Sequence, residues 1–202
     1  MSKALGNIVM TELRNELTSL KVELKKRDDR IQGLENRVLS LEKDCDRLEQ
    51  YSRRNSLRIA GIPENDQEDP CARSLKVIND VIKPEAPITL MDIDRIHRVG
   101  KRNKDGKPRA MLIKFSTYRA RKRVMDAKKN LKHQLLSADL PNKLFLNDDL
   151  TRTRSHLCYL AREKKKEGKL NDVWTADGSV LIKDLANKVH SINSIQDLDK
   201  HV

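Results

Sequence analysis

Lysine and arginine side chains crowd one stretch of this sequence, and the chemistry they share is the binding of phosphate groups. Residues 95–132 hold 15 basic and two acidic side chains, a net charge of +13. The whole chain of 202 residues carries +12, so the other residues sum to −1. Guanidinium and ammonium groups pair with phosphate oxygens whatever the base sequence. This basic block therefore favours nucleic acid as a partner over the alternative of a solvated basic helix face.

Residue types that could support catalysis or hold a metal are not arranged for either. The three cysteines, Cys45, Cys71 and Cys158, are far apart and odd in number, which fits neither a disulfide framework nor a metal site. Asp148 and Asp149 precede a predicted helix, where a cap explains them better than a ligand role. The sequence shows no carboxylate triad, nucleotide-binding loop or nucleophile–base pair. We predict no enzyme activity, no metal and no cofactor.

The composition limits the class of protein. Hydrophobic residues make up 37 %, charged residues 36 % and aromatic residues 3 % of the chain. This apolar share is thin for one globule of 202 residues and favours a long solvated helix with small domains. No apolar run approaches the roughly 18 residues of a membrane helix, and the amino terminus does not resemble a signal peptide. We expect a protein of the cytoplasm, the nucleus or both, with no membrane partner.

Apolar residues near the amino terminus recur every 3.5 residues, which is typical of a left-handed coiled coil. The a positions are Leu17, Leu24, Ile31, Val38 and Cys45, and the d positions are Leu13, Leu20, Arg27, Leu34, Leu41 and Leu48. A continuous helix is predicted from about residue 8 to 52, because no proline precedes Pro63. Three attractive pairs between neighbouring helices outnumber two repulsive ones, so a parallel homo-oligomer is weakly favoured. The attractive pairs are Arg30–Glu35, Arg37–Glu42 and Glu16–Lys21, and the repulsive ones are Glu23–Asp28 and Asp44–Glu49. The residues at the a and d positions do not decide between a coiled coil of two helices and one of three. A single amphipathic helix that packs on its own chain is the less favoured alternative.

The middle of the chain predicts strand, helix, strand, strand, helix and strand. Alternating or helical apolar spacing predicts these elements at residues 57–61, 71–82, 93–99, 110–115, 117–129 and 144–146. Their order is that of the ferredoxin-like fold, which RNA-recognition motifs share. Such motifs stack bases on aromatic residues of the first and third strands, yet here Arg58 and the run 111–113 hold those places. We therefore predict contacts to phosphates, with base stacking not the main mode.

The carboxy-terminal segment predicts a small α+β domain. A helix begins near Thr151 and ends at a lysine run before Gly168. Asp177-Gly178 between two β-rich runs predicts a hairpin, and a short helix is expected from Ser194. The predicted fold class is thus α+β, with a coiled coil at 1–53, an RRM-like domain at 54–147 and a small domain at 148–202.

Several motifs, taken in order, resemble one protein family. Residues 54–64, 108–115 and 149–151 resemble the first-open-reading-frame protein of LINE-type retrotransposons. Residues 30–35 and 37–42 both match the Arg-h-x-x-h-Glu pattern with which such coils trimerise. Residues 97–100, 145–148 and 174–178 are similar to the related few-polyhedra (FP) domain of baculoviruses and invertebrate retroelements.

The resemblance implies a homotrimer that clamps single-stranded RNA or DNA, packages RNA into a ribonucleoprotein and acts as a nucleic acid chaperone. It implies that Arg54, Arg58 and Arg109 contact nucleic acid, with Arg152 or Arg154 a looser match. The alternative is a coiled-coil adaptor of the viral FP type that does not bind nucleic acid directly. The expected nucleic-acid contacts are Arg54, Arg58, Arg98, Lys101, Arg102, Lys107, Arg109, Lys114, Arg121, Arg123, Arg152 and Arg154. The expected oligomer contacts are Leu17, Leu24, Arg30, Ile31, Leu34, Glu35, Arg37, Val38, Leu41 and Glu42.

Overall fold

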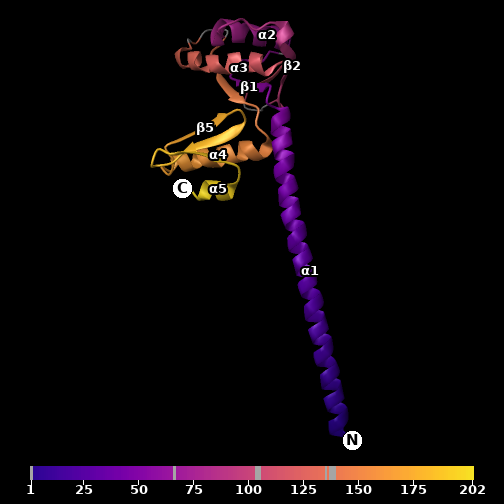
Figure 1. Cartoon of the computed structure of the whole chain (residues 1–202). Helices are drawn as coiled ribbons and strands as arrows, with labels where there is room; N and C mark the ends of the chain where they lie inside the picture. Colours follow the sequence, from indigo (N-terminus) through magenta and orange to yellow (C-terminus); the bar gives the residue numbers. More distant parts are fainter. Residues whose placement is uncertain (1, 66, 103–105, 135, 137–139) are drawn as a thin grey trace. The chain divides into compact units, whose positions relative to one another are not determined.

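The protein has an α+β fold with one long amino-terminal helix and two antiparallel sheets (Figure 1). The computed structural model describes residues 2–65, 67–102, 106–134, 136 and 140–202. The chain divides into two units, Met1–Arg47 and Leu48–Val202. The first unit is helical throughout its described length, and the second holds both sheets.

Helix α1, Ser2–Ser52, is a single uninterrupted helix, as the lack of proline predicts. It starts six residues earlier than expected and ends where expected. Its heptad side chains lie in solvent in the single chain, because one helix cannot bury its own apolar stripe. The exposed side chains include all ten expected oligomer contacts: Leu17, Leu24, Arg30, Ile31, Leu34, Glu35, Arg37, Val38, Leu41 and Glu42.

A four-stranded antiparallel sheet forms the centre of the second unit. Its strands are β1 (Ser56–Ala60), β2 (Ile93–Arg98), β3 (Met111–Phe115) and β4 (Phe145–Asp148). They lie in the order β2-β3-β1-β4. The alternation of side chains separates two faces, because Leu57 and Ile59 of β1 are fully buried while Arg58 between them is part-exposed. Arg58 pairs across the sheet with Leu112 and Asn147, so these three side chains share the open face.

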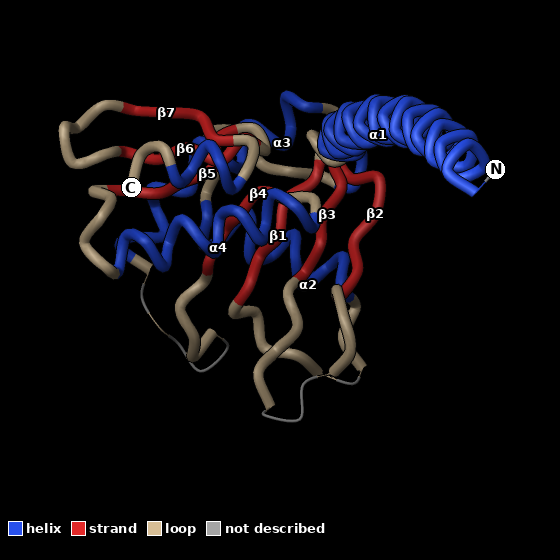
Figure 2. The backbone as a smooth tube through the Cα atoms, turned by 90° about the horizontal axis from the view of Figure 1, so that it is seen from below, coloured by secondary structure: helices blue, strands red, loops and turns tan. Residues whose placement is uncertain are grey.

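Helical segments cover the other face of this sheet (Figures 1 and 2). They are α2 (Pro70–Val77), a π-helical turn (Ile78–Ile82), a 3-10 turn (Leu90–Asp92), α3 (Tyr118–Asp126) and a 3-10 stretch (Ala127–His133). Both helices expected here are confirmed, but each changes its winding in its last turns. Asp69 and Thr117 cap α2 and α3, since their side chains accept hydrogen bonds from the first free backbone N–H groups.

Strand β2 departs from strict alternation. A register shift between Ile93 and Arg95 lets Ile93 and Ile96 both pack against the core. Strict alternation along 93–99 would place Ile93 and Arg95 on one face, and the register shift breaks that alternation. Because of this shift, Arg98 lies on the same face as Ile96, where it pairs across the sheet with the buried Met111.

The carboxy-terminal segment forms a second, smaller core. Its elements are α4 (Arg152–Lys166), β5 (Asp172–Ala176), β6 (Ser179–Lys183), β7 (Val189–Ile192) and α5 (Ile195–Asp199). The expected hairpin is confirmed, and Asp177 and Gly178 both adopt the positive φ that a tight two-residue turn needs. Strand β7 was not predicted. Leu157 and Ala161 of α4 pack on Val180 and Ile182 of the sheet.

Candidate nucleic-acid interface

A cavity of about 590 Å³ lies between the open face of the four-stranded sheet and α4. Four arginines from separate parts of the chain line it, and we call it the arginine pocket. Arg53 follows α1, Arg58 lies on β1, and Arg152 and Arg162 lie on α4. The other lining residues are Asn147, Asp148, Leu150, Thr151, Ser155, His156, Cys158, Tyr159 and Thr175.

One buried carboxylate holds the two arginines on the sheet side of the arginine pocket. Arg53 Nη1 donates to both Asp149 carboxylate oxygens at 3.1 Å, and Arg58 Nε donates to Oδ1 at 2.6 Å. Arg53 Nη2 also donates to Glu49 at 2.7 Å. Asp149 is almost fully buried, whereas about a third of each guanidinium side chain remains exposed. Asp149 therefore orients both arginines and leaves part of each facing the pocket.

The segment that carries Asp149 is itself fixed by Gln50. The Gln50 side chain is buried, donates from Nε2 to the Asp149 carbonyl at 3.0 Å and accepts from the Thr151 N–H at 2.9 Å. Thr151 in turn caps α4 by accepting from the Arg154 N–H. The last turn of α1, the strand β4 and the start of α4 are thus joined by one amide side chain. This junction sets where the α4 arginines lie opposite the sheet.

Helix α4 presents two different faces. Leu157, Cys158 and Ala161 are buried towards the second core. The face towards the arginine pocket carries Arg152, Ser155, His156, Tyr159 and Arg162, all of them exposed. Their spacing of three and four residues places them along one side of the helix. A second cavity of about 420 Å³ adjoins the same helix and shares Arg152 and His156 with the pocket.

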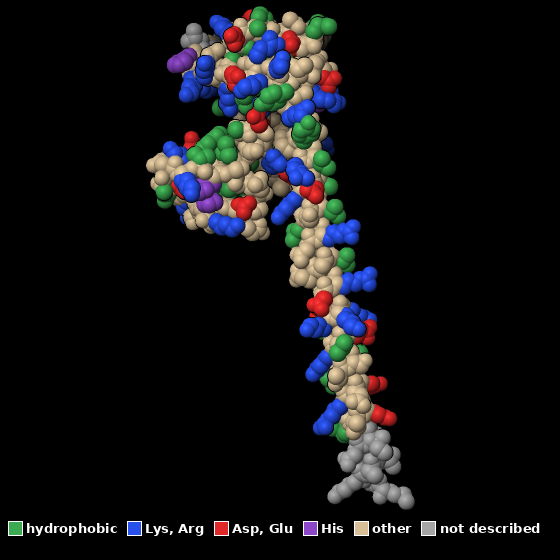
Figure 3. Space-filling model, viewed as in Figure 1, with side chains coloured by type: hydrophobic (Ala, Val, Ile, Leu, Met, Phe, Trp, Pro, Cys, Tyr) green, Lys and Arg blue, Asp and Glu red, His purple; other side chains and the backbone are tan. Residues whose placement is uncertain are grey.

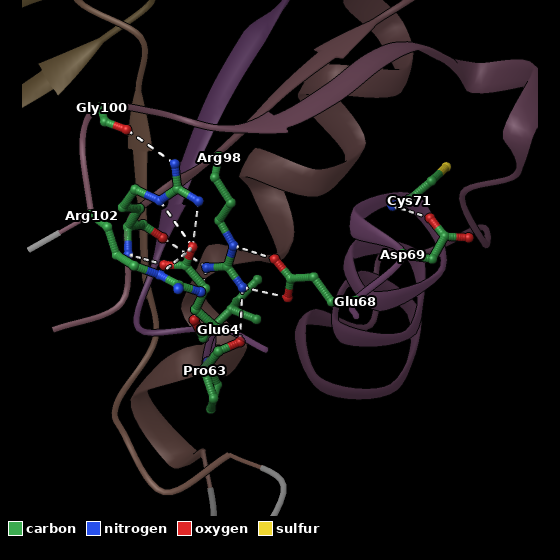
Figure 4. Close-up of polar contacts among 10 residues, drawn as sticks. Pro63, Glu64, Glu68, Asp69, Cys71, Arg98, Gly100 and Arg102 are labelled. Atoms are coloured by element: carbon green, nitrogen blue, oxygen red, sulfur yellow. Dashed lines mark hydrogen bonds and ion pairs between the residues drawn. The ribbon is translucent and has the colours of Figure 1, made fainter. Parts of the chain in front are cut away.

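Arg98 was expected at the interface, and the structure places it inside the protein instead (Figure 4). Its side chain is only 5 % exposed. It donates to both carboxylate oxygens of Glu68, at 2.6 and 2.7 Å, and to three backbone carbonyls, those of Ile62, Pro63 and Arg109. All five N–H donors of the guanidinium are therefore used. The assignment of Arg98 to nucleic acid is corrected because no donor is left for a phosphate.

Arg109 lies beside Arg98 and is also engaged. It forms an ion pair with Glu64 and donates to the Gly100 carbonyl at 3.1 Å. The hydrogen bond from Arg109 is the main cause that lowers the pKa of the Glu64 carboxyl to about 2, against the opposing effect of burial. Arg102 approaches the same carboxylate at 3.8 Å. Arg109 is part-exposed, but its charge is balanced by Glu64 and it lies outside the lining of the arginine pocket.

Helix α3 contributes further arginines that serve the fold. Arg121 is 4 % exposed and forms ion pairs with Asp148 of β4 and Asp177 of the β5–β6 turn. Arg123 donates to Asp92 at 2.9 Å. The assignment of Arg121 to nucleic acid is corrected, since its role is to tie α3 to the carboxy-terminal segment. Lys114 on β3 pairs with Asp94 at 3.0 Å but keeps about a third of its side chain exposed on the open face.

The remaining expected contacts lie on exposed surface or at the second core. The guanidinium of Arg54 lies over the ring of Tyr51, with its Cζ atom 4.1 Å from the ring centroid. Lys101, Arg102 and Lys107 are exposed on the connection between β2 and β3, of which residues 103–105, including the basic block's Lys104, lie outside the described residues. Arg154 donates to the Gly178 carbonyl at 2.9 Å, so of the two α4 candidates Arg152 is the one at the pocket.

Of the residues that line the arginine pocket, Arg58 and Arg152 were expected from the sequence, whereas Arg53, His156, Tyr159 and Arg162 were not. A signal for the α4 residues was present, because Arg152, His156, Tyr159 and Arg162 recur at helical spacing opposite the apolar face. Across the visible face in Figure 3, Lys and Arg side chains are spread over all the parts that are coloured by residue type. Charge alone therefore does not mark the site, and the convergence of several elements does.

Comparison with known proteins adds no family: the chain matches no protein-family model and no curated protein. In the described part of the chain, no cluster of three or more His, Cys, Asp or Glu residues is placed to hold a metal ion. None of the described helices is both long and apolar enough to cross a membrane.

Proposed function

We propose that this protein binds single-stranded nucleic acid along the arginine pocket without reading its sequence, and that it does so without catalysis. The convergence of Arg53, Arg58, Arg152 and Arg162 on one cavity carries the proposal. Its volume of about 590 Å³ is in the ~300–1,000 Å³ range of ligand pockets and suits a short stretch of one strand. Guanidinium forks match phosphate oxygens, so a sugar–phosphate backbone is the ligand that this set of donors fits best.

The arrangement of the second unit supports an RRM-like interpretation of the central sheet. Its strand order, β2-β3-β1-β4 with α2 and α3 on the same face, agrees with the ferredoxin-like order. The open face, where RNA-recognition motifs bind, carries Arg58, Leu112 and Asn147 in one cross-strand row. That row holds no aromatic residue, so Arg58 and Asn147 offer the site a guanidinium and an amide.

The exposed stripe of α1 supports a parallel homo-oligomer. A helix with a solvent-exposed heptad seam is stabilised when the seam packs between chains. The two Arg-h-x-x-h-Glu motifs, Arg30–Glu35 and Arg37–Glu42, favour three strands by their resemblance to the LINE-type coils. A trimer would place three arginine pockets on one assembly, which raises the affinity for a long strand through the effective concentration of linked sites. Packaging of RNA and strand annealing, as the resemblance implies, would follow from such multivalent binding.

Titration of a labelled single-stranded oligonucleotide with the full chain at several salt concentrations tests the proposal. With four arginines at the backbone, log Kobs should fall against log[salt] with a slope of about −3. Sequences of different composition should bind alike. Micromolar or weaker binding with a flat salt slope would contradict the proposal and favour the coiled-coil adaptor.

Crosslinking through Cys45 tests the oligomer. Cys45 is exposed and lies at an a position, so a parallel in-register coil brings the Cys45 side chains of neighbouring chains into one layer. Mild oxidation should give disulfide-linked dimers, and light scattering of the reduced protein should give three chains. The variant Cys45→Ser should not crosslink, because Cys158 is buried and Cys71 lies outside the coil. A monomer in solution would contradict the coil.

A further inference from the structure

Tyr159 occupies the middle of the α4 face that lines the arginine pocket. It lies one turn after His156 and one turn before Arg162, and both of these residues line the same cavity. Tyr159 is 57 % exposed as a residue, although α4 buries Leu157, Cys158 and Ala161 against the second core. An exposed aromatic ring thus lies between His156 and Arg162 on one wall of the cavity, and Arg58 lines the same cavity from the sheet.

The other two tyrosines of the chain are already engaged. The Tyr118 hydroxyl donates to Asp177 at 3.0 Å, which fixes α3 to the β5–β6 turn. Tyr51 is 62 % exposed, but the Arg54 guanidinium lies over its ring at 4.1 Å. Tyr159 is the tyrosine whose ring borders the candidate site, and packing of the second core does not account for its position on the pocket side.

A single strand of nucleic acid presents phosphates and unpaired bases side by side. A site with guanidinium groups and an adjacent exposed ring therefore fits a nucleotide whose base is not paired. Stacking on an aromatic ring tolerates every base, because each base has a flat π face. In a duplex the bases are stacked inside and cannot reach such a ring unless they are flipped out.

We infer that Tyr159 is the platform on which the arginine pocket stacks one unpaired base, and that this contact makes the site prefer single strands to duplexes. The inference rests on the proposed function and adds base contact to it. The prediction that base stacking is not the main mode was based on the first and third strands alone. A stacking residue on α4 would change that prediction. The aromatic residue comes from α4, on the opposite wall of the pocket from the open sheet face.

The test compares three probes of equal charge per strand: an oligonucleotide of about 16 nucleotides, the same length of abasic backbone, and the duplex. Fluorescence anisotropy with the full chain gives the affinity for each. The wild type should bind the single strand more tightly than either other probe. Tyr159→Ala should lose about 5- to 150-fold in affinity for the single strand, the equivalent of ~1–3 kcal/mol of stacking. Its affinity for the abasic probe and its salt slope should not change.

Two further variants complete the test. Tyr159→Phe keeps the ring and should bind like the wild type. Tyr51→Ala removes an equally exposed ring that does not line the pocket and should also bind like the wild type. Circular dichroism confirms that each variant is folded.

The possible failures can be told apart. If the wild type binds strand and abasic backbone equally, or Tyr159→Ala binds the strand as tightly as the wild type, the stacking inference is overturned while phosphate binding stands. Weak wild-type binding with a flat salt slope overturns both proposals.

Discussion

The arginines of the basic block and the arginines of the arginine pocket have opposite relations to the sequence. Arg98, Arg109 and Arg121 lie in the block that carries the whole net charge, yet each pairs with a carboxylate. Arg53, Arg152 and Arg162 lie outside that block, yet they line one cavity with Arg58. A dense run of charge in the sequence is therefore not the same as free charge in the fold.

The reason is that the neutralising carboxylates come from elsewhere in the chain. Glu64 and Glu68, before α2, bind Arg109 and Arg98, and Asp148 at the end of β4 binds Arg121. None of these acids lies within 95–132, so counting charges inside the block gives +13 and overlooks them. Buried arginines must have such partners, because an unpaired buried charge is very costly.

The largest effect should come from breaking the Arg98 site. Arg98→Ala leaves Glu68 and three backbone carbonyls without their donor, and loss of one partner of a buried ion pair costs ~3–5 kcal/mol. Urea unfolding should show the free energy of unfolding lowered by that amount. Lys101→Ala, on the exposed connection nearby, should change it by less than ~0.5 kcal/mol. Equal stability of the two variants would contradict the structural role of Arg98.

The next largest effect should be on binding. Arg58→Ala combined with Arg162→Ala removes two of the four pocket arginines from opposite walls. We expect about a 100-fold loss of affinity for a single strand and a salt slope less steep by about 1.4, because each phosphate contact on a single strand contributes about 0.7. Oligomer size should not change, since neither residue lies in the coil.

A control of matched charge decides between the two arginine groups. Arg119→Ala with Lys129→Ala removes the same two charges from exposed positions of the basic block, outside the pocket. This pair should weaken binding by less than about threefold, the effect of a distant exposed charge in salt. If it weakens binding as much as the pocket pair does, the interface belongs to the basic block.

Local patterns in the sequence predicted most of the elements. The alternation at 57–61 and 110–115 predicted β1 and β3, and Asp177-Gly178 predicted the hairpin. These features depend on neighbouring residues, so one sequence suffices to see them. Strand β7 escaped notice because it is short, and the shift in β2 because a bulge leaves no local signal.

The candidate site was only partly predictable because it depends on contacts between distant residues. Arg58 could be expected from its place in β1, but its partner Asp149 lies 91 residues later. Likewise, nothing local to Arg98 shows that Glu68 and the carbonyls before it will surround its guanidinium. The α4 face was readable from its spacing, yet only the fold shows that it lies opposite the open sheet.

A smaller effect is expected from the Glu64–Arg109 pair as the pH falls. The pKa of Glu64 is lowered to about 2, mainly by the hydrogen bond from Arg109, so the charged carboxylate stabilises the folded state. That contribution is fully present above pH of about 4.5 and is lost as the pH falls towards 2. Glu64→Gln should therefore lower stability at pH 7 and flatten the fall of stability with acid in that window.

Unfolding by urea at a series of pH values measures this difference. Glu85→Gln, at an exposed position, serves as the control and should follow the wild-type curve. If Glu64→Gln loses stability with acid as steeply as the wild type does, Arg109 is not held by Glu64. Arg109 would then be available again as a contact to nucleic acid.

The smallest effect should come from the connection between β2 and β3. Lys101→Ala with Lys107→Ala removes two exposed charges of the basic block that do not line the arginine pocket. If this connection acts only through its long-range field, the loss of affinity should stay below about threefold and vanish at high salt, where the Debye length falls to about 3 Å at 1 M. A loss that persists at high salt would show direct contact with the strand, and the interface would then extend from the pocket across the open sheet face to this connection.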